Sequence, residues 1–187
     1  MAASSRGWIL FGSLAVAATA IDLVSKHVAF DRLGMPGSGR AAVLVPPRIL
    51  VLETNLNEGA LFGMGQGLGL GFAAVSVVAI VGIVSLLARP AIREDRWMVV
   101  ALGLIVGGIV GNLYDRVGLP GLAWHAPPER VGEPVRAVRD WIHFQLPGVI
   151  DWPIFNLADS WLVIGAGILL LLALRPAAAE AAARPES

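Results

Sequence analysis

Four long apolar stretches constrain the fold of this 187-residue chain more than any other feature. They lie near 7–27, 69–88, 97–116 and 154–174, and each has about the 20 residues that an α-helix needs to cross the hydrocarbon core of a bilayer. The composition agrees, because 56% of the residues are hydrophobic, 15% are charged and the mean hydropathy is +0.72. We therefore predict an all-α membrane protein with four transmembrane helices.

The first apolar stretch has a second interpretation, because an N-terminal apolar segment after a lone basic residue, here Arg6, can be a cleaved signal peptide. The stretch is long for a signal peptide, and its C-terminal end is polar. A permanent transmembrane helix is therefore the favoured interpretation.

The third apolar stretch carries Gly103, Gly107 and Gly111 at four-residue intervals. Residues four apart lie on the same face of a helix. Small residues let transmembrane helices approach closely, so we predict that another helix packs against this strip.

Arginine density predicts the orientation in the membrane. Arginines crowd the connection between the second and third stretches and flank the chain ends, at Arg89, Arg93, Arg96, Arg6, Arg175 and Arg184. Cytoplasmic segments carry such an excess of basic residues, so both termini are predicted to be cytoplasmic. The two long connections, near 28–68 and 117–153, are then predicted to lie on the outer side.

The two long connections differ in composition. The first has strand-like runs on either side of Pro46–Pro47, which predicts a small extracytoplasmic β-sheet. The second is rich in proline and charge, which predicts an irregular excursion. We predict one four-helix membrane domain over 1–176 and a flexible cytoplasmic tail over 177–187.

Composition also excludes several functions. The 14 basic and 14 acidic residues balance, so no basic face for nucleic acid is indicated. The absence of cysteine excludes thiolate catalysis, disulfides and cysteine-based metal sites. The spacings of His27, His125 and His143 match no metal-ligand motif, and we predict neither a metal ion nor a cofactor.

Ionisable and amide residues at the ends of the apolar stretches are candidates for function, because lipid makes them costly. Asp22 and Lys26 are four residues apart and can pair on one helical face, and Asn112, Asp115 and Arg116 share a face in the third stretch. A structural ion pair is the favoured interpretation of Asp22 and Lys26, and a pair of Asp115 with Arg116 explains the second group as well as a functional role does. The same residues also fit a small ion-coupled transporter or channel, or a structural subunit of a larger complex, although we find no internal repeat.

The fourth stretch opens with Asn156 and Asp159 on one helical face. Asn156 fits a helix cap and Asp159 fits the first turn, where the helix dipole favours negative charge. The other interpretation of Asp159, a functional carboxylate, is the favoured one. Asp140 lies on the same side of the membrane, but its spacing alone does not bring it near Asp159.

Four sequence segments combine polar and small residues: DLVSK at 22–26, NEGALFG at 57–63, GGIVGNLYDR at 107–116 and FNLAD at 155–159. Taken together, they resemble the lipoprotein signal peptidases, also called signal peptidase II. The first two resemble that family's D-x-x-[ST]-K and N-x-G-A-[AS]-F-[GS] segments, with Leu61 in place of a small residue. The last two match its G-G-x-x-G-N-x-x-D-R and F-N-x-A-D motifs.

The resemblance implies that Asp159 is one of two catalytic aspartates. VRDW at 138–141 is the best counterpart of the family's V-x-D-[FM] segment, which makes Asp140 the second, while Asp151 is the rival candidate. Arg139 and Trp141 are unusual neighbours for this aspartate. The connection from Arg116 to Asp140 is also longer than is typical, by roughly fifteen residues, which a loop tolerates.

The remaining polar residues receive supporting roles from the resemblance. Substrate binding or support of the dyad is implied for Asn57, Asn112, Arg116 and Asn156. A structural role is implied for Asp22, Lys26 and Asp115.

The implied function is that of an intramembrane aspartyl endopeptidase, active as a monomer among phospholipids at the outer face of the bacterial inner membrane. Its implied substrates are prolipoproteins, cut just before the diacylglyceryl-modified cysteine. Two carboxyls that share a proton can act as base and acid, and burial raises their pKa. Which aspartate starts protonated stays open.

Overall fold

The computed structural model describes residues 2–45, 49–59, 65 and 67–174. Its helices are α1 Ala2–Leu33, α2 Gly69–Leu87, the short α3 Pro90–Glu94, α4 Arg96–Arg116 and α5 Leu157–Ala173. Its strands are β1 Ala42–Val45, β2 Leu50–Asn57, β3 Val138–Leu146 and β4 Ile150–Asp151. The expected tail and most of the NEGALFG segment, with Leu61 in it, fall outside the described residues.

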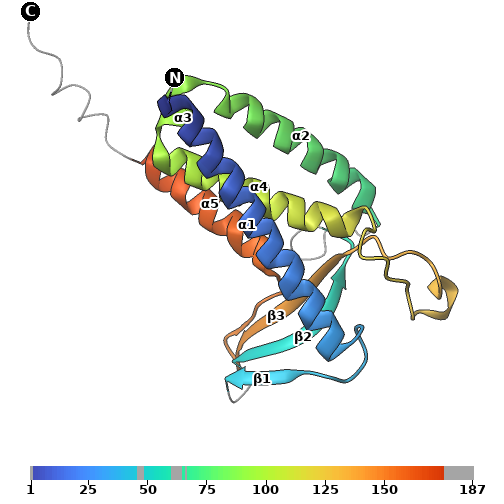
Figure 1. Ribbon diagram of the computed structural model, residues 1–187. Coiled ribbons are helices and arrows are strands. Elements are labelled where there is room, and N and C mark those ends of the chain that lie inside the picture. The colour runs from blue at the N-terminus through green and yellow to red at the C-terminus, as the bar shows by residue number, and fades with distance from the viewer. Residues whose placement is uncertain (1, 46–48, 60–64, 66, 175–187) are drawn as a thin grey trace, which may run out of the picture.

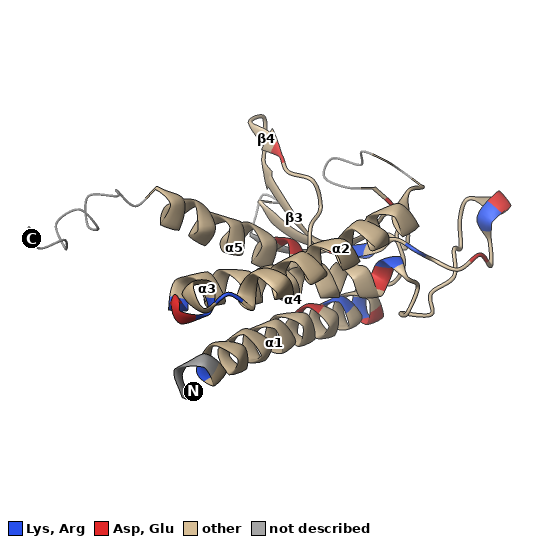
Figure 2. Cartoon of the chain, turned by 90° about the horizontal axis from the view of Figure 1, so that it is seen from above, with Lys and Arg blue, Asp and Glu red and all other residues tan. Residues whose placement is uncertain are grey.

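Within the described part of the chain, three helices are long and apolar enough to cross a membrane: Ser5–Leu33 of α1, together with α2 and α4. They confirm the first three predicted stretches, although α1 is longer at both ends than predicted. α5 is apolar but has 17 residues, and it begins three residues later than the stretch at 154–174. A fourth span therefore stays a prediction. Figure 2 shows that the charged residues gather toward the helix ends and leave long uncharged lengths between them.

The central helix α4 packs closely on α1 and on α5. A Cβ placed on Gly107 would lie 2.5 Å from the Cβ of Ala18 in α1, and one placed on Gly108 would lie 2.5 Å from the carbonyl oxygen of Ala158 in α5. The predicted glycine strip is confirmed, and its partner is α1. Glycine is required here because the backbones of neighbouring helices occupy the space that a side chain would take.

The strands form one antiparallel sheet in the order β1-β2-β3-β4 at one end of the helices (Figure 1). The small β-sheet predicted in the first connection is confirmed, because β1 and β2 pair antiparallel. β3 pairs with β2, with Asp140 opposite Asn55 and Val138 opposite Asn57. The sheet thus joins the two long connections, and strands β3 and β4 were not predicted.

Between α4 and β3 the chain makes an irregular excursion, residues Val117–Ala137, as the sequence predicted. Its two sides are held by a bridge between Ala123 and Pro134 and by a 2.9 Å hydrogen bond from the Trp124 amide to the Glu133 carbonyl. A 3₁₀ turn over Pro128–Arg130 lies near its tip. Figure 1 shows the excursion projecting sideways from the sheet end of the molecule.

The described ends of the chain lie together. Figure 1 places the start of α1, the short α3 and the C-terminal end of α5 at one end of the helices, and the sheet at the other. The N-terminal end of α5 and the C-terminal end of α4 point toward the sheet. This arrangement gathers the polar residues of α1, α4 and α5 at the junction between helices and sheet.

Candidate active site

Asp140 lies in β3, and its side chain is almost completely buried. The segment before α5 returns to this strand, because the Trp141 amide donates to the Phe155 carbonyl at 3.0 Å and the Phe155 amide donates to the Ile142 carbonyl at 3.0 Å. This backbone pairing places Asn156 beside Asp140, although the two are 16 residues apart.

Asn156 is the N-cap of α5 and forms a reciprocal capping box with Asp159. Its side-chain oxygen accepts from the Asp159 amide at 3.0 Å, and Asp159 Oδ2 accepts from the Asn156 amide at 3.2 Å. The capping interpretation of these residues is therefore confirmed. Capping fixes where the Asp159 carboxyl points and does not occupy all of its lone pairs.

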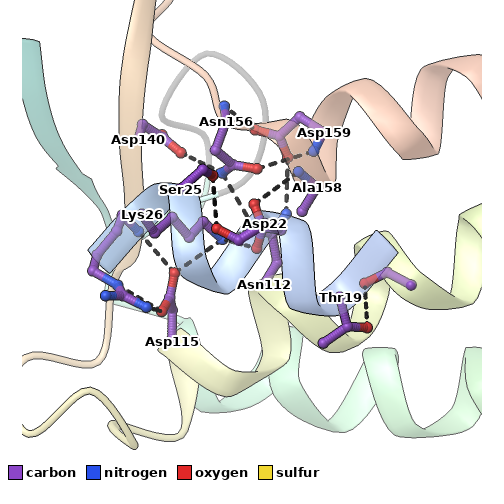
Figure 3. Close-up of polar contacts among 12 residues, drawn as sticks. Thr19, Asp22, Ser25, Lys26, Asn112, Asp115, Asp140, Asn156, Ala158 and Asp159 are labelled. Carbon is purple, nitrogen blue, oxygen red and sulfur yellow. Dashed lines mark hydrogen bonds and ion pairs between the residues drawn. The ribbon is translucent and has the colours of Figure 1, made fainter. Parts of the chain in front are cut away.

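Two side-chain amides connect the carboxyls of Asp140 and Asp159 (Figure 3). Asn156 Nδ2 donates to Asp140 Oδ1 at 2.6 Å and to Asn112 Oδ1 at 3.2 Å. Asn112 Nδ2 in turn donates to Asp159 Oδ1 at 2.8 Å. The two carboxyls, which come from β3 and α5, thus belong to one hydrogen-bonded group with an asparagine from α4.

A fully buried charge cluster orients Asn112 from the side of α1. Lys26 Nζ donates to Asn112 Oδ1 at 2.9 Å and lies 2.8 Å from Asp22 Oδ2 and 3.1 Å from Asp115 Oδ2. Because a lysine only donates, it fixes the oxygen of the Asn112 amide toward α1 and the NH₂ group toward Asp159. Asp22 also accepts from the Ala158 amide at 2.9 Å, which ties α1 to the first turn of α5.

Arg139, an unusual neighbour in the motif, has a clear partner. Its Nε donates to Asp115 Oδ1 at 2.9 Å, and its backbone amide donates to Asp115 Oδ2 at 3.1 Å. The guanidinium is buried and lies over the ring of Phe30 at 6.0 Å. Arg139 thereby fixes the strand position of Asp140 to α4, a role that the sequence did not predict.

A cavity of about 580 Å³ opens on Asp159. Its polar part is lined by Asn57, Asn112 and Arg116, and the rest is mainly apolar and comes from 152–155 and the first turns of α5. Arg116 lies over the ring of Phe72 at 5.4 Å and donates to the carbonyl of Gly59 at 3.2 Å. The cavity therefore offers an extended apolar wall with a carboxyl and amides at one end.

Burial and the nearby charge of Asp159 together raise the pKa of Asp140 to about 8, although contacts with Asn156 and Asn57 act to lower it. Asp140 is therefore protonated at neutral pH. A buried protonated carboxyl next to a second carboxyl that borders a cavity is the arrangement required for acid and base action by one pair.

Comparison with known proteins agrees with this geometry. The family model described as signal peptidase (SPase) II matches residues 14–175. The chain belongs to the signal peptidase II family. A lipoprotein signal peptidase of Rhodopirellula baltica is 42% identical over 169 residues, covering 88% of this chain and 71% of the relative. One from Geobacillus thermodenitrificans is 30% identical, covering 87% of this chain and 88% of the relative.

Solved structures share the fold. A bacterial membrane enzyme determined by the in meso method at 2.3 Å resolution superimposes with a TM-score of 0.70 at 26% identity, covering 93% of this chain and 91% of the other. A second, determined by the same method at 1.9 Å, gives a TM-score of 0.67 at 27% identity. Family membership makes the chain a peptidase of a membrane family and argues against the transporter alternative.

The residues that the signal peptidase II resemblance selected meet at one place. The structure brings together Asp140, Asp159, Asn57, Asn112, Arg116, Asn156, Asp22, Lys26 and Asp115. The rival Asp151 lies elsewhere, in β4, where its side chain is 75% exposed and is bonded to His143 at 2.8 Å. Sequence reasoning missed Arg139, whose partner Asp115 is 24 residues away, and Glu58, whose partner Arg130 is 72 residues away.

Proposed function

We propose that this protein is an aspartic endopeptidase that removes signal peptides from diacylglyceryl-modified prolipoproteins, with Asp140 and Asp159 as the catalytic pair. The observation that carries the proposal is the hydrogen-bonded group in which Asn156 and Asn112 join these two carboxyls at the polar end of an apolar cavity. A peptidase without cysteine can hydrolyse a peptide bond with such a pair.

Asp159 acts as the base in this scheme. It accepts hydrogen bonds from Asn112 Nδ2 and from the Asn156 amide, which hold its carboxyl at the border of the cavity. It takes a proton from a water molecule as the water oxygen attacks the scissile carbonyl carbon.

Asp140 acts as the acid, because burial keeps it protonated at neutral pH. It donates its proton to the carbonyl oxygen, which gives a neutral tetrahedral intermediate. Collapse of this intermediate returns a proton to Asp140 from the hydroxyl. Asp159 then transfers its proton to the leaving amide nitrogen, so both carboxyls regain their starting states.

The walls of the cavity supply the remaining functions. Arg116 and Asn57 present donors beside Asp159, where they orient the backbone of the substrate. The apolar residues of α5, among them Leu162 and Val163, accept an apolar signal peptide. Asp22, Lys26 and Asp115 act on the reaction only through the side chains that they hold.

We place α5 across the membrane as a fourth span and both termini in the cytoplasm. The dense arginines at 89–96 support this orientation, because they lie at the end of the helices opposite to the sheet (Figure 1). The catalytic pair then lies at the outer boundary of the membrane, in a monomer that contacts phospholipids along its helices. The excess of apolar residues exposed on α2 fits such contact.

Cleavage of a purified prolipoprotein by the full chain in detergent tests the substrate class. The diacylglyceryl-modified form is expected to be cut, and mass spectrometry is expected to place the cut directly before the modified cysteine. The same prolipoprotein without the lipid serves as the control and is expected to be cut at least tenfold more slowly. Equal cleavage of both forms, or a cut elsewhere, would contradict the proposed substrate.

A further inference from the structure

The irregular excursion contacts the turn after β2 through Arg130. Arg130, in the 3₁₀ turn, donates from Nη1 to Glu58 Oε2 at 2.8 Å and from Nη2 to Glu58 Oε1 at 2.9 Å. Two parallel bonds between a guanidinium and a carboxylate fix direction as well as distance. Figure 2 shows charged residues at the tip of this projection.

Contacts within the excursion also hold the guanidinium of Arg130 in place. It stacks on the ring of Trp124 at 4.2 Å, and its Nε donates to Glu133 Oε2 at 3.2 Å. Trp124 and Glu133 face each other across the excursion through a backbone hydrogen bond of 2.9 Å. The excursion therefore presents the fork of Arg130 in one orientation, which reduces the entropy lost in binding Glu58.

Glu58 lies in the middle of a turn that borders the catalytic pair. On one side of it, Asn57 ends β2, lines the cavity and makes a polar contact with the Asp140 carboxyl. On the other side, the Gly59 amide donates to Asn57 Oδ1 at 3.0 Å, and the Gly59 carbonyl accepts from Arg116 at 3.2 Å. Arg116 thus holds the turn from inside the site, and Arg130 holds it from outside.

We propose that Arg130 is a positioning residue of the active site: through Glu58 it keeps the turn Asn57–Gly59 against Arg116 and Asp140. The excursion Val117–Ala137 then contributes to activity, because it carries Arg130. This inference rests on the proposed function, because it concerns the same catalytic pair.

The effect of losing the Arg130–Glu58 pair follows from its exposure. The two side chains are 33% and 21% exposed, and a pair of this kind adds little to stability. Asn57 lowers the pKa of Asp140, so a displaced Asn57 leaves that pKa higher. Loss of the pair should therefore lower kcat and move the alkaline limb of the pH profile upward, with little change in the unfolding temperature.

The test compares the full chain in detergent with Arg130→Glu, Glu58→Arg, Arg130→Lys and the double variant Glu58→Arg/Arg130→Glu. Arg32→Glu is the matched control, because it makes the same charge change in an exposed pair with Asp31 at the sheet end. Each charge reversal is expected to lower kcat about tenfold with KM changed less than threefold. Arg130→Lys should give an intermediate loss, the double variant should recover at least threefold over either single variant, and Arg32→Glu should retain full activity.

Amide hydrogen exchange of the segment at Gly59 gives a readout that needs no substrate. The Gly59 amide, bonded to Asn57, is expected to exchange about tenfold faster in Arg130→Glu than in wild type or in Arg32→Glu. If the Gly59 amide exchanges faster in Arg130→Glu but the wild type does not cleave the substrate, the positioning contact is supported and the proposed function is contradicted. Unchanged exchange together with full activity of both charge reversals would overturn the positioning role while leaving the peptidase intact.

Discussion

Two sets of ion pairs in this molecule use the same kinds of side chain in opposite surroundings. In the buried set, Lys26 contacts two carboxylates, and Arg139 contacts one of them, with no more than 7% of any of these side chains exposed. In the second set, called the exposed set below, Arg130 contacts Glu58 and Glu133, and 21–54% of each of these side chains is exposed. The bond lengths are similar, so the difference in consequence comes from the surroundings.

The comparison teaches what each set contributes. Burying charges is costly, and replacing a whole buried pair by apolar residues is often neutral, but removing one member leaves an uncompensated charge. The buried set therefore specifies the position of Asn112 and of the strand that carries Asp140, and it tolerates no single loss. The exposed set can be lost without unfolding, so it can adjust a site without supporting the fold.

The largest effect is expected from Lys26→Met. It leaves the carboxylates of Asp22 and Asp115 buried without their shared cation, and it removes one of the two donors to the side-chain oxygen of Asn112. We expect a loss of about 3–5 kcal/mol of stability and of all cleavage. Thermal unfolding in detergent measures the loss of stability, and Arg32→Met is a control for removal of an exposed cation. A stable, active Lys26→Met protein would show that the buried set is dispensable.

A steric change without a change of charge sharpens the comparison. Gly108→Ala places a Cβ 2.5 Å from the Ala158 carbonyl oxygen and pushes α5, with Asp159, away from α4. We expect a loss of about 1–3 kcal/mol and a lower kcat. Gly12→Ala is the matched control, because a Cβ there meets no atom within 4 Å. If both variants unfold at the same temperature, close packing at α4 is not what positions the site.

A change of pH tests the buried carboxyl directly. In the folded protein, Asp140 keeps its proton to about pH 8. In the unfolded chain, this residue loses its proton near the ordinary pKa of 3.8. The folded state thus binds more protons between these pH values, and stability falls as the pH rises through this window. Asp140→Asn should unfold at the same temperature as wild type near pH 4 and several degrees higher at pH 8.

The activity of the wild type gives the second part of this prediction. Above about pH 8 the acid Asp140 is ionised, so kcat/KM should fall about tenfold per pH unit. An unfolding difference that is the same at pH 4 and pH 8, or a rate that is constant up to pH 10, would contradict a protonated Asp140.

The smallest effect is expected in the exposed β3–β4 hairpin. Hydrogen bonds from Gln145 and His143 lower the pKa of the exposed Asp151 carboxyl. The stability that these hydrogen bonds add is present above the ordinary pKa of an aspartate, and it is lost as the pH falls through the lower pKa of the folded state. Asp151→Asn should therefore leave the unfolding temperature at pH 7 within about one degree of wild type, because exposed pairs add little. A large drop would mean that water does not screen this hairpin.

Sequence patterns predicted the features that depend on local order. The apolar stretches predicted three of the long helices, and the glycines at 103, 107 and 111 predicted a close helix contact, which α1 makes. The strand-like runs in the first connection predicted the pairing of β1 with β2. The spacing of Asn156 and Asp159 predicted the cap, which is also why α5 begins later than its apolar stretch.

Other features depend on pairings between distant residues. β3 was missed because Arg139, Asp140 and His143 interrupt its apolar pattern, and their partners, Asp115, Asn156 and Glu53, lie far away in the sequence. Asp140 reaches Asp159 only because Phe155 pairs with Ile142. Only the family resemblance, and no spacing, indicated that the two aspartates work together.

Cleavage of the lipid-modified prolipoprotein by Asp140→Asn, Asp159→Asn and Asp151→Asn, each shown to be folded, tests the central claim most directly. The first two variants replace a proton donor and a base with an amide, and kcat should fall at least a thousandfold in each, while Asp151→Asn keeps the wild-type rate. Loss of activity in Asp151→Asn alone, with Asp140→Asn active, would contradict the assignment of the catalytic pair.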